Sequence, residues 1–383
     1  MTQLTDDWVA APETQAVCAM LTGAGFQALF VGGCVRNALF NLSVNDIDIA
    51  TDARPETVVK LAKDAGLHAI PTGIDHGTVT IVSNHVPHEV TTFRRDVETD
   101  GRRAVVAYAD SAEEDAHRRD FTMNALYATP EGDVIDPLGG LTDLQARRVR
   151  FIDDAEARIK EDYLRILRFF RFHAWYGDAK AGLDADGLAA CAENATGIAA
   201  LSKERIGAEV KKLLGAPDPA PSVASMAQAG VLMQAVPGAD AKPLPILVHM
   251  EQQLGVEPDA IRRLAVIGGE DLPKKLRLSR DDARRLARLR DGIENMQAPA
   301  ALGHYFGVDG ARDVLLLRSA IFETQMPEGW ESDVATGAAA TFPIKAADLM
   351  PAYSGAALGA HLKELEARWV ASGFSLGKDK LLS

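Results

Sequence analysis

The chain has 383 residues, of which 47% are hydrophobic and 25% charged, and its formal net charge is −13. This composition is that of a globular protein long enough for two or more domains, and the charge argues against a protein that coats nucleic acid through bulk electrostatics. The three cysteines show no C-x-x-C spacing, so we expect neither a disulfide nor a zinc site. The acidic N-terminus and the lack of any run of about 18 apolar residues predict a cytoplasmic protein without membrane contact.

The first predicted elements form a strand, a glycine turn and a helix. Ala28 to Val31 is a short apolar run, Gly32 and Gly33 break it, and Cys34 to Phe40 has helical periodicity. Backbone N–H groups at the start of such a helix suit a phosphate. Both glycines are therefore candidate nucleotide-binding residues.

The next apolar segment carries two acids, Asp46 and Asp48. Strand side chains alternate between faces, so both carboxylates leave one face, about 7 Å apart by Cα. Two acids on one face can share hard cations. A lone D-x-D is more often a solvated strand edge or turn, and glycosyltransferases also use D-x-D, but without the preceding G-G-x-V-R.

A third acid lies in residues 88–93, which alternate like a strand. Glu89 could lie beside the aspartate strand and complete the oxygen ligands of a two-metal site, for which Mg²⁺ is the natural ion. Metals about 3.5 to 4 Å apart would activate an attacking hydroxyl and neutralise a leaving pyrophosphate. We therefore predict Asp46, Asp48 and Glu89 as catalytic carboxylates, with Asp46 and Asp48 as metal ligands.

The remainder of the first 150 residues mixes short strands with helices. A helix is predicted over 122–127, where Asp120 or Thr122 can cap it and Arg118 and Arg119 flank its first turn, an arrangement that suits a triphosphate and its ribose. The alternative for the arginine pair is an exposed charged corner. Other predicted strands cover 77–82, 89–93, 105–108 and 134–135, and another helix covers 55–65.

After residue 150 the sequence is helical almost throughout, with its clearest break at 215–221 and a softer one at 297–303. The pattern therefore predicts an α/β part followed by an all-α part. The predicted helices are 154–176, 202–214, 223–229, 258–267, 280–294 and 357–371.

One predicted helix carries Asp162, Arg165, Arg168 and Arg171, spaced every three residues. Cytosine and adenine both present an amino donor beside a ring-nitrogen acceptor, which a carboxylate and a guanidinium can read, whereas uracil and guanine would mismatch both. Asp162 and Arg165 are the candidate base readers, which leaves Arg168 and Arg171 for phosphates. The alternative is an amphipathic helix with i,i+3 ion pairs on its wet face.

Taken together, these motifs resemble the class II tRNA nucleotidyltransferases, the family of bacterial CCA-adding enzymes and poly(A) polymerases. They follow the family's order across about residues 28 to 172, and jointly they are very specific. The matching residues are Gly32-Gly33-Cys34-Val35-Arg36, Asp46-Ile47-Asp48, Arg118 to Ala125, Asp136 to Gly140 with Asp143-Leu144, and Glu161-Asp162 with Arg165.

The resemblance implies an α/β nucleotidyltransferase head with a palm-like mixed sheet in residues 1–150. It further implies a helical neck with the nucleobase-reading helix in 151–215, a helical body in 216–296 and a helical tail in 297–383. The implied reaction is template-independent addition of CCA from CTP and ATP to the 3′ end of tRNA, with pyrophosphate released and Mg²⁺ as the cofactor. The implied partner is the tRNA acceptor end, and no protein partner is predicted.

By the same resemblance, Asp46 and Asp48 hold the metals, Glu89 is the third carboxylate, and Asp162 with Arg165 reads the base. The predicted nucleotide-binding residues are Gly32, Gly33, Arg36, Arg119, Asp120, Asn124, Asp162, Arg165, Arg168 and Arg171.

The chain also departs from the family pattern. Asn37 stands where the family usually has aspartate, and the absence of any His-Asp dipeptide makes an additional phosphohydrolase activity unexpected. Residues 94–103 resemble the flexible loop of complete CCA-adding enzymes, which favours all three additions. The alternatives are poly(A) synthesis, partial (CC- or A-only) addition, an enzyme acting on small nucleotides, and a catalytically silent RNA-binding protein.

Overall fold

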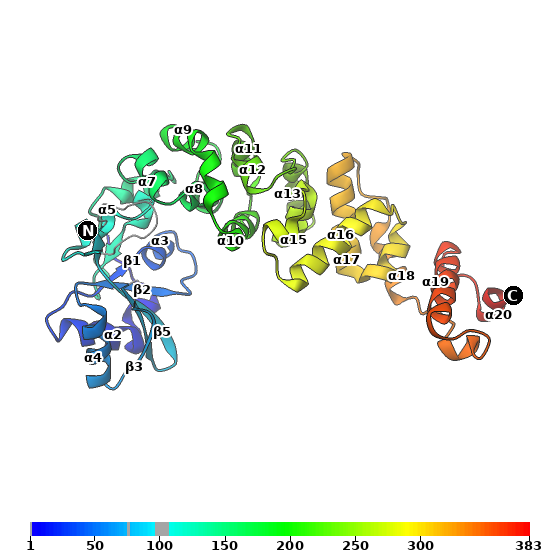
Figure 1. The fold of residues 1–383 in the computed structure, drawn as a ribbon, viewed down its shortest axis with the longest axis horizontal. Coiled ribbons are helices and arrows are strands. Elements are labelled where there is room, and N and C mark those ends of the chain that lie inside the picture. Colours follow the sequence, from blue (N-terminus) through cyan, green and yellow to red (C-terminus); the bar gives the residue numbers. More distant parts are fainter. Residues whose placement is uncertain (1, 75–76, 96–106) are drawn as a thin grey trace. The chain divides into compact units, whose positions relative to one another are not determined.

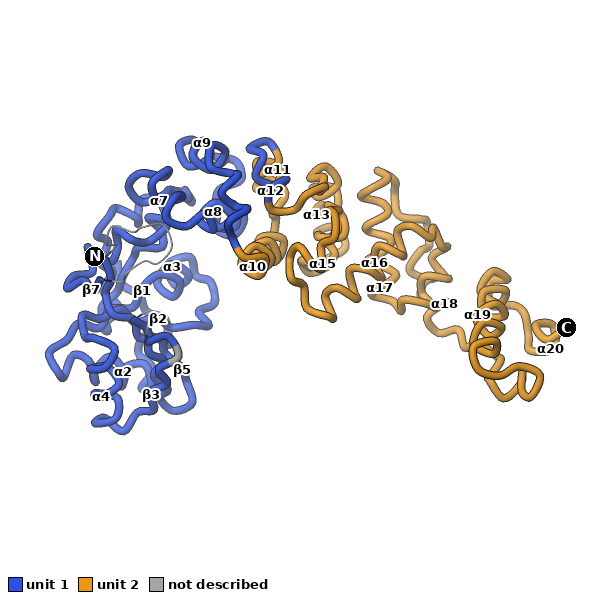
Figure 2. Tube along the Cα trace, viewed as in Figure 1, with its two compact units in different colours: residues 1–201, 228–234 blue, residues 202–227, 235–383 orange. Residues whose placement is uncertain are grey.

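A computed structural model describes residues 2–74, 77–95 and 107–383 of the chain (Figure 1). It divides into two compact units, of which unit 1 comprises residues 1–201 and 228–234 and unit 2 comprises residues 202–227 and 235–383 (Figure 2). The finer division into head, neck, body and tail stays a prediction.

A mixed seven-stranded sheet forms the centre of unit 1, with strand order β3-β4-β5-β2-β1-β8-β9. β2 and β5 run parallel, and the other neighbouring strands run antiparallel. This confirms the predicted α/β fold with a mixed sheet. The strands are β1 (Leu29–Val31), β2 (Ile47–Thr51), β3 (His68–Gly73), β4 (Thr78–Ser83), β5 (Val86–Thr92), β8 (Tyr127–Ala128) and β9 (Val134–Ile135), and a separate ribbon pairs β6 (Arg94–Arg95) with β7 (Ala107–Tyr108).

One face of this sheet is covered by α2 (Pro12–Thr22) and α4 (Pro55–Asp64), which pack on β3, β4 and β5. Ile47, Ile49, His88 and Val90 are buried, and the imidazole of His88 lies 3.1 Å from the hydroxyl of Thr14 on α2. Side chains alternate along a strand, so Asp48 and Glu89 belong to the other face. α2 and α4 therefore do not cover the face that carries the carboxylates, part of which packs in a separate buried cluster that includes Ala50.

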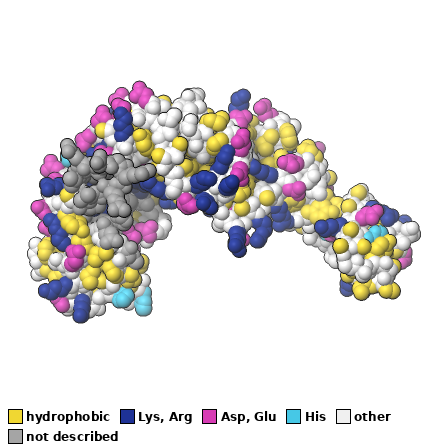
Figure 3. Space-filling view, in the orientation of Figure 1, with side chains coloured by type: hydrophobic (Ala, Val, Ile, Leu, Met, Phe, Trp, Pro, Cys, Tyr) yellow, Lys and Arg dark blue, Asp and Glu magenta, His cyan; other side chains and the backbone are white. Residues whose placement is uncertain are grey.

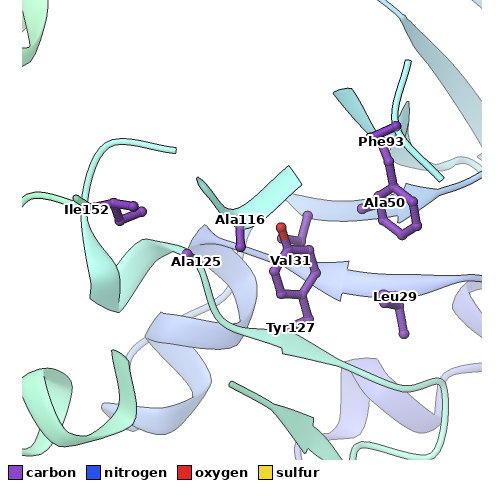
Figure 4. Packing of buried hydrophobic residues seen from close by; sticks show 9 residues of the cluster. Leu29, Val31, Ala50, Phe93, Ala116, Ala125, Tyr127 and Ile152 are labelled. Carbon is purple, nitrogen blue, oxygen red and sulfur yellow. The ribbon is translucent and has the colours of Figure 1, made fainter. Parts of the chain in front are cut away.

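The core beneath the predicted site contains small side chains that let the elements approach closely (Figure 4). Tyr127 on β8 is fully buried and packs in the same cluster as Val31 on β1. The cluster joins the strands to the segments on either side of residue 120. Its buried members are Leu29, Val31, Ala50, Phe93, Ala109, Ala116, Ala125, Tyr127 and Ile152.

Residues 1–201 of unit 1 contain further helices, of which α3 packs against β1 and β2. They are α1 (Asp7–Ala10), α3 (Gly33–Leu39), α5 (Ala112–His117), η2 (Thr122–Asn124), α6 (Gly140–Gln145), α7 (Ala155–Glu161), α8 (Leu164–Tyr176), α9 (Ala185–Glu193) and η3 (Ala195–Ala200).

Two helix predictions in this unit are wrong in extent. The segment 122–127 forms one 3₁₀ turn and then enters strand β8, because Tyr127 and Ala128 pair with β1 in the sheet. The predicted helix 154–176 is two helices, α7 and α8. Asp162 is extended between them (φ −153°), and its carboxylate accepts the backbone N–H of Leu164.

Beyond residue 201 the described chain is helical, which confirms the predicted all-α part. The helical region α17 was not predicted, because its glycines interrupt the apolar pattern, and it consists of two helical segments joined by a kink at Gly307 (φ 72°, ψ 179°). Gly303 lies so close to α18 that an added Cβ would stand 2.1 Å from the Val334 carbonyl oxygen. The helices are α10 (Lys203–Leu214), α11 (Ala220–Gln228), α12 (Val231–Ala235), α13 (Leu244–Gln253), α14 (Ala260–Ile267), α15 (Leu272–Lys275), α16 (Arg280–Glu294), α17 (Pro299–Phe322), α18 (Trp330–Ala339), η4 (Ala346–Leu349), α19 (Gly355–Ala371) and α20 (Lys378–Leu382).

None of the helices in the described residues is long and apolar enough to cross a membrane.

Candidate nucleotidyl-transfer site

The three predicted carboxylates lie on and beside two neighbouring strands. Asp48 on β2 and Glu89 on β5 are direct register partners across the parallel pair, and Asp46 directly precedes β2. Asp46 and Glu89 are exposed, whereas Asp48 is half-buried. Within the described residues, no three Asp, Glu, His or Cys side chains are grouped closely enough to hold a metal ion by themselves. The fold thus places a carboxylate pair on the open face, with the third acid one residue outside the strand.

The surroundings of Asp48 destabilise its negatively charged form. Burial and the neighbouring carboxylate of Glu89 raise the pKa of Asp48 to about 6, although Arg119 opposes the shift. A carboxylate pair with this electrostatic repulsion is stabilised by any cation bound between its oxygens.

The glycine turn lies directly beside this strand pair. Gly32 has φ 71° and ψ −114°, a left-handed conformation that favours glycine, and it leads into α3. A Cβ at Gly32 would stand 3.1 Å from the Arg119 Nη1, so the turn also leaves room for that guanidinium. The thiol of Cys34, the second residue of α3, lies 3.7 Å from the backbone oxygen of Asp48 and holds the helix start against β2.

Arg36 is buried on α3, where its partners are all neutral. Its guanidinium donates to the side chains of Asn124 (2.7 Å), Asn37 (3.0 Å) and Tyr176 (2.9 Å), and its Nε has no hydrogen-bond partner among the residues that the structure describes. Burial lowers the pKa of Arg36, although Tyr176 and Asp120 oppose the shift. Asn37, which replaces the family's usual aspartate, therefore contributes a hydrogen bond here without a compensating charge.

A stack of rings and guanidinium groups connects α3 to α8. Arg147 lies over the ring of Phe40, Phe40 stacks on Tyr176 at 5.8 Å and 5°, and Arg36 lies 4.1 Å from the centre of Tyr176. Contacts of this kind add to the area buried. The glycine-turn helix and the predicted base-reading helix are thus held together within unit 1.

Arg119 is oriented by a residue that the sequence analysis did not identify. The buried carboxylate of Asp115 accepts from Arg119 Nε (3.1 Å) and Nη2 (2.9 Å) and from the hydroxyl of Tyr127 (2.8 Å). Burial alone would raise the pKa of Asp115, but Arg119 and Arg118 lower it below its ordinary value. Asp115 precedes Arg119 by one helical turn, and that i,i+4 spacing was the available signal.

Asp120 connects the glycine turn to α8. One carboxylate oxygen accepts from the Asn124 amide (3.0 Å) and from the Phe121 N–H, and the other binds the guanidinium of Arg168 (2.6 Å). Since protein donors occupy both oxygens, the geometry gives Asp120 a positioning part. The guanidinium carbons of Arg168 and Arg171 lie 5.3 and 4.8 Å from the centre of the Phe172 ring.

The two predicted base readers lie at the start of α8, but they are not paired with each other as neighbours on one continuous helix. The side chain of Arg165 binds Glu161 at 2.5 Å and donates to the backbone carbonyls of Arg158 (2.8 Å) and Arg118 (3.0 Å). Asp162 instead caps the Leu164 N–H, because the chain breaks between α7 and α8. Glu161, four residues before Arg165, is thus its ion partner.

The chain matches two family models. Residues 28–150 match the Poly A polymerase head domain, and residues 183–242 match the model described as probable RNA and SrmB-binding site of polymerase A. The first match spans the sheet, the glycine turn and the carboxylates.

Among curated proteins, the chain is 31% identical over 379 residues to the mitochondrial CCA tRNA nucleotidyltransferase 1 of Mus musculus, covering 92% of this chain and 85% of that protein. It is 42% identical over 204 residues to the CCA-adding enzyme of Leuconostoc citreum, which covers 53% of this chain and 49% of that enzyme.

Solved structures give the same result for the fold. The Bacillus stearothermophilus CCA-adding enzyme in complex with CTP superposes with a TM-score of 0.71 at 26% identity, covering 94% of each chain. The Thermotoga maritima CCA-adding enzyme complexed with tRNA shares the fold at a TM-score of 0.69 and 17% identity, covering 100% of this chain and 98% of that chain. Two family models, an extended relative and matching structures agree: this chain is a nucleotidyltransferase and belongs to the family of CCA-adding enzymes, which implies the use of divalent metal.

Proposed function

We propose that this protein adds CCA to the 3′ end of tRNA from CTP and ATP, without a nucleic-acid template and with release of pyrophosphate. The observation that carries the proposal is the direct register of Asp48 and Glu89 across β2 and β5, beside the glycine turn that opens α3. Carboxylates next to a phosphate-binding turn are what nucleotidyl transfer requires.

We propose Mg²⁺ as the metal, held by Asp46 and Asp48 with Glu89 beside them. The donors fit, because all three are carboxylate oxygens and no cationic side chain of the described residues forms an ion pair with Asp48 or Glu89. When bound, the metal would lower the pKa of the attacking hydroxyl and neutralise the leaving pyrophosphate.

The chain's own groups would then position the nucleotide. The N–H groups after Gly32 and Gly33, together with Arg36 and Arg119, would face the triphosphate, and Asn124 would orient Arg36. We propose Arg168 and Arg171 as further phosphate contacts near the nucleotide.

Base reading is proposed for Asp162 and Arg165. Both terminal nitrogens of Arg165 are engaged by Glu161 and two backbone carbonyls, so the guanidinium has a fixed direction before any nucleotide arrives. Such preorganisation raises selectivity, because a guanidinium that is already held in place loses little conformational freedom when the nucleotide binds.

The tRNA partner would be bound in part by unit 2. On the face shown in Figure 3, Lys and Arg side chains gather over α10 and α15. Lys203, Arg205 and Lys212 on α10 are exposed, and Lys211 lies beside Asp282. Exposed cations of this kind bind phosphates without reading sequence.

Partial addition and poly(A) synthesis are the alternatives. The loop that favours complete CCA addition lies largely outside the described residues, since 96–106 are not placed. A cytoplasmic location also stays a proposal, and mammalian relatives carry a mitochondrial name.

The deciding experiment incubates the protein with Mg²⁺, each labelled nucleotide, and tRNA ending at the discriminator base, after C, or after CC. Products that stop at CCA support the proposal. Products that stop at CC, or a long A tail on a primer that is not tRNA, would replace it with the corresponding alternative. No incorporation on any primer, with a folded protein, would leave a binding protein without catalysis.

A further inference from the structure

Tyr176, the last residue of α8, contacts the helix that follows the glycine turn. It is buried, and its ring stacks on Phe40 and packs against Phe172 with 5.5 Å between the ring centres. The hydroxyl accepts a hydrogen bond from Arg36 Nη2 at 2.9 Å, and the guanidinium carbon of Arg36 lies 4.1 Å from the centre of the same ring. Tyr176 therefore fixes Arg36 through both its hydroxyl and its ring.

The nitrogen that Tyr176 holds is the one beside the glycine turn. A Cβ added at Gly33 would stand 3.8 Å from Arg36 Nη2, so this end of the guanidinium borders the turn. The two hydrogens of Nη2 are engaged by Asn37 (3.0 Å) and by the Tyr176 hydroxyl. The guanidinium therefore lies beside the turn as a positive charge in a fixed position.

No carboxylate in the described part of the chain forms an ion pair with Arg36. Of the charged side chains nearby, Asp120 favours the charge of Arg36 and Arg171 opposes it. Asp120 is itself bound to the guanidinium of Arg168 at 2.6 Å. The hydrogen-bond acceptors of Arg36 are neutral side chains, those of Asn37, Asn124 and Tyr176. An anion at the glycine turn would therefore meet a positive charge that the protein leaves without a directly bound counter-charge.

We propose that Tyr176 is a positioning residue for triphosphate binding and that it acts through Arg36. It holds the guanidinium beside the turn before a nucleotide arrives, so that little conformational freedom is lost on binding. Because the turn is taken to receive the triphosphate, this role rests on the proposed function. The proposed base reader Arg165 lies near the start of the same helix, about 16 Å away along its axis. One helix would thus position a base contact near one end and a triphosphate contact at the other.

The test variant is Tyr176→Phe, which keeps the stacked ring and removes only the hydroxyl. Tyr163→Phe is the matched control, because it removes the same group at the other end of α8, where the ring packs against Gly197. Arg36→Gln removes the guanidinium through which Tyr176 is proposed to act. The variant that combines Tyr176→Phe with Arg36→Gln completes a double-mutant cycle.

The measurements on the full chain are equilibrium binding of CTP, ATP and inorganic tripolyphosphate, the KM and kcat for CTP, and the preference for CTP over UTP. We expect Tyr176→Phe to weaken binding of all three ligands and to raise the KM for CTP, each roughly fivefold. The kcat and the preference for CTP over UTP should stay at the wild-type values, because neither the carboxylates nor the base contacts change. Tyr163→Phe should match wild type, and Tyr176→Phe should have no further effect in the Arg36→Gln background.

Three other results would overturn the role of Tyr176. They are Tyr176→Phe binding that matches Tyr163→Phe, weaker CTP binding with unchanged tripolyphosphate binding, and the same fivefold loss when Arg36→Gln is already present. A wild-type protein that binds CTP and tripolyphosphate but adds no CCA to tRNA would contradict the proposed function. The binding measurements would still decide in that case whether Tyr176 positions the triphosphate.

Discussion

Both units contain charged side chains away from solvent, and in unit 2 a buried network of arginines and carboxylates matches charge with charge. Glu251 is buried and accepts from Arg262 at 2.7 Å and from Arg263 at 2.9 Å. Asp313 accepts from Arg262 at 2.8 Å and from Arg285 at 2.9 Å. The network also fixes the end of α10, because Arg263 donates to the Leu214 carbonyl.

On the open face of unit 1, Asp48 and Glu89 stand side by side and no cation of the described residues forms an ion pair with either. Arg36, in the same unit, is buried among neutral partners. Charge networks in which every group has a partner of opposite charge therefore maintain the fold. Charges without such a partner mark a place where a ligand of opposite charge can bind.

The largest effect is expected for Asp48→Asn. Transfer should fall by at least about 10³-fold, because a proposed metal ligand is lost. In EDTA at pH 8, however, the variant should melt at a higher temperature than wild type. Burial and Glu89 raise the pKa of Asp48 to about 6 from 3.8, so the charged form costs folding free energy above pH 6.

This gain should shrink as the pH falls from 6 toward 4, since the wild-type carboxyl then becomes protonated in the folded protein. Single-turnover CMP incorporation and thermal melts at pH 8 and pH 5 measure the two effects. If Asp48→Asn is inactive and also melts at a lower temperature than wild type in EDTA, the charge on Asp48 does not destabilise unit 1, and the contrast with the paired charges of unit 2 is lost.

Glu251→Gln should have the opposite effect in unit 2. Two buried guanidinium groups lose their shared carboxylate, so the free energy of unfolding should fall by about 3 to 5 kcal/mol. Urea denaturation measures it, and transfer per folded molecule should stay unchanged. Glu270→Gln is the control, because that exposed carboxylate pairs with Lys275 at the surface and its loss should change stability little. If Glu251→Gln and Glu270→Gln lose similar free energies of unfolding, burial of the Glu251 network contributes nothing to stability.

Asp115→Asn tests a completed pair inside unit 1. Burial opposes ionisation of Asp115, but Arg119 and Arg118 lower its pKa, so its stabilising contribution is present above about pH 4 and is lost as the pH falls further. At pH 7 the variant should lose about 2 kcal/mol of unfolding free energy. It should also show a higher KM for CTP, because Arg119 is less well held.

Urea denaturation at pH 7 and pH 3.5 provides the measurement. The difference between Asp115→Asn and wild type should narrow at the lower pH. A constant difference at both pH values would mean that the carboxylate charge does not hold Arg119.

The smallest effect is expected for Asp162→Ala. The preference for CTP over UTP should fall roughly tenfold, which corresponds to about 1.4 kcal/mol and lies within the range of about 1 to 3 kcal/mol for one base contact. Asp162→Asn is the matched variant, because its amide oxygen can still accept the Leu164 N–H that Asp162 caps. An equal loss of rate with all four nucleotides would refute base reading and leave Asp162 as a helix cap.

Local patterns predicted the parts of the site that depend on local geometry. The alternation in residues 46–49 and 88–93 was enough to place Asp48 and Glu89 each opposite the buried apolar side chains of its own strand, because a strand's period of two does not depend on its neighbours. The register that pairs the two acids is given by the structure. The glycine turn before α3 was predictable for the same reason, since only glycine tolerates the φ of Gly32 easily.

The parts that failed depend on packing between distant segments. Asp120 became the partner of Arg168 because α8 packs against the segment around residue 120, 48 residues earlier in the chain. Likewise Gly303 weakens the helical signal of α17 in the sequence, yet in the structure it allows the close approach of α18.

The register between β2 and β5 has a consequence for how inactive protein could arise. His88 and Glu89 are adjacent, and the pairing that brings Glu89 opposite Asp48 also brings the imidazole of His88 to Thr14 beneath the sheet. A shift of β5 by one residue would place the Glu89 carboxylate in the interior covered by α2 and α4. The imidazole of His88 would then lie on the opposite face of the sheet. Chains that misalign this acid therefore also lose stability, so quality control by unfolding and proteolysis would remove molecules that cannot perform the chemistry.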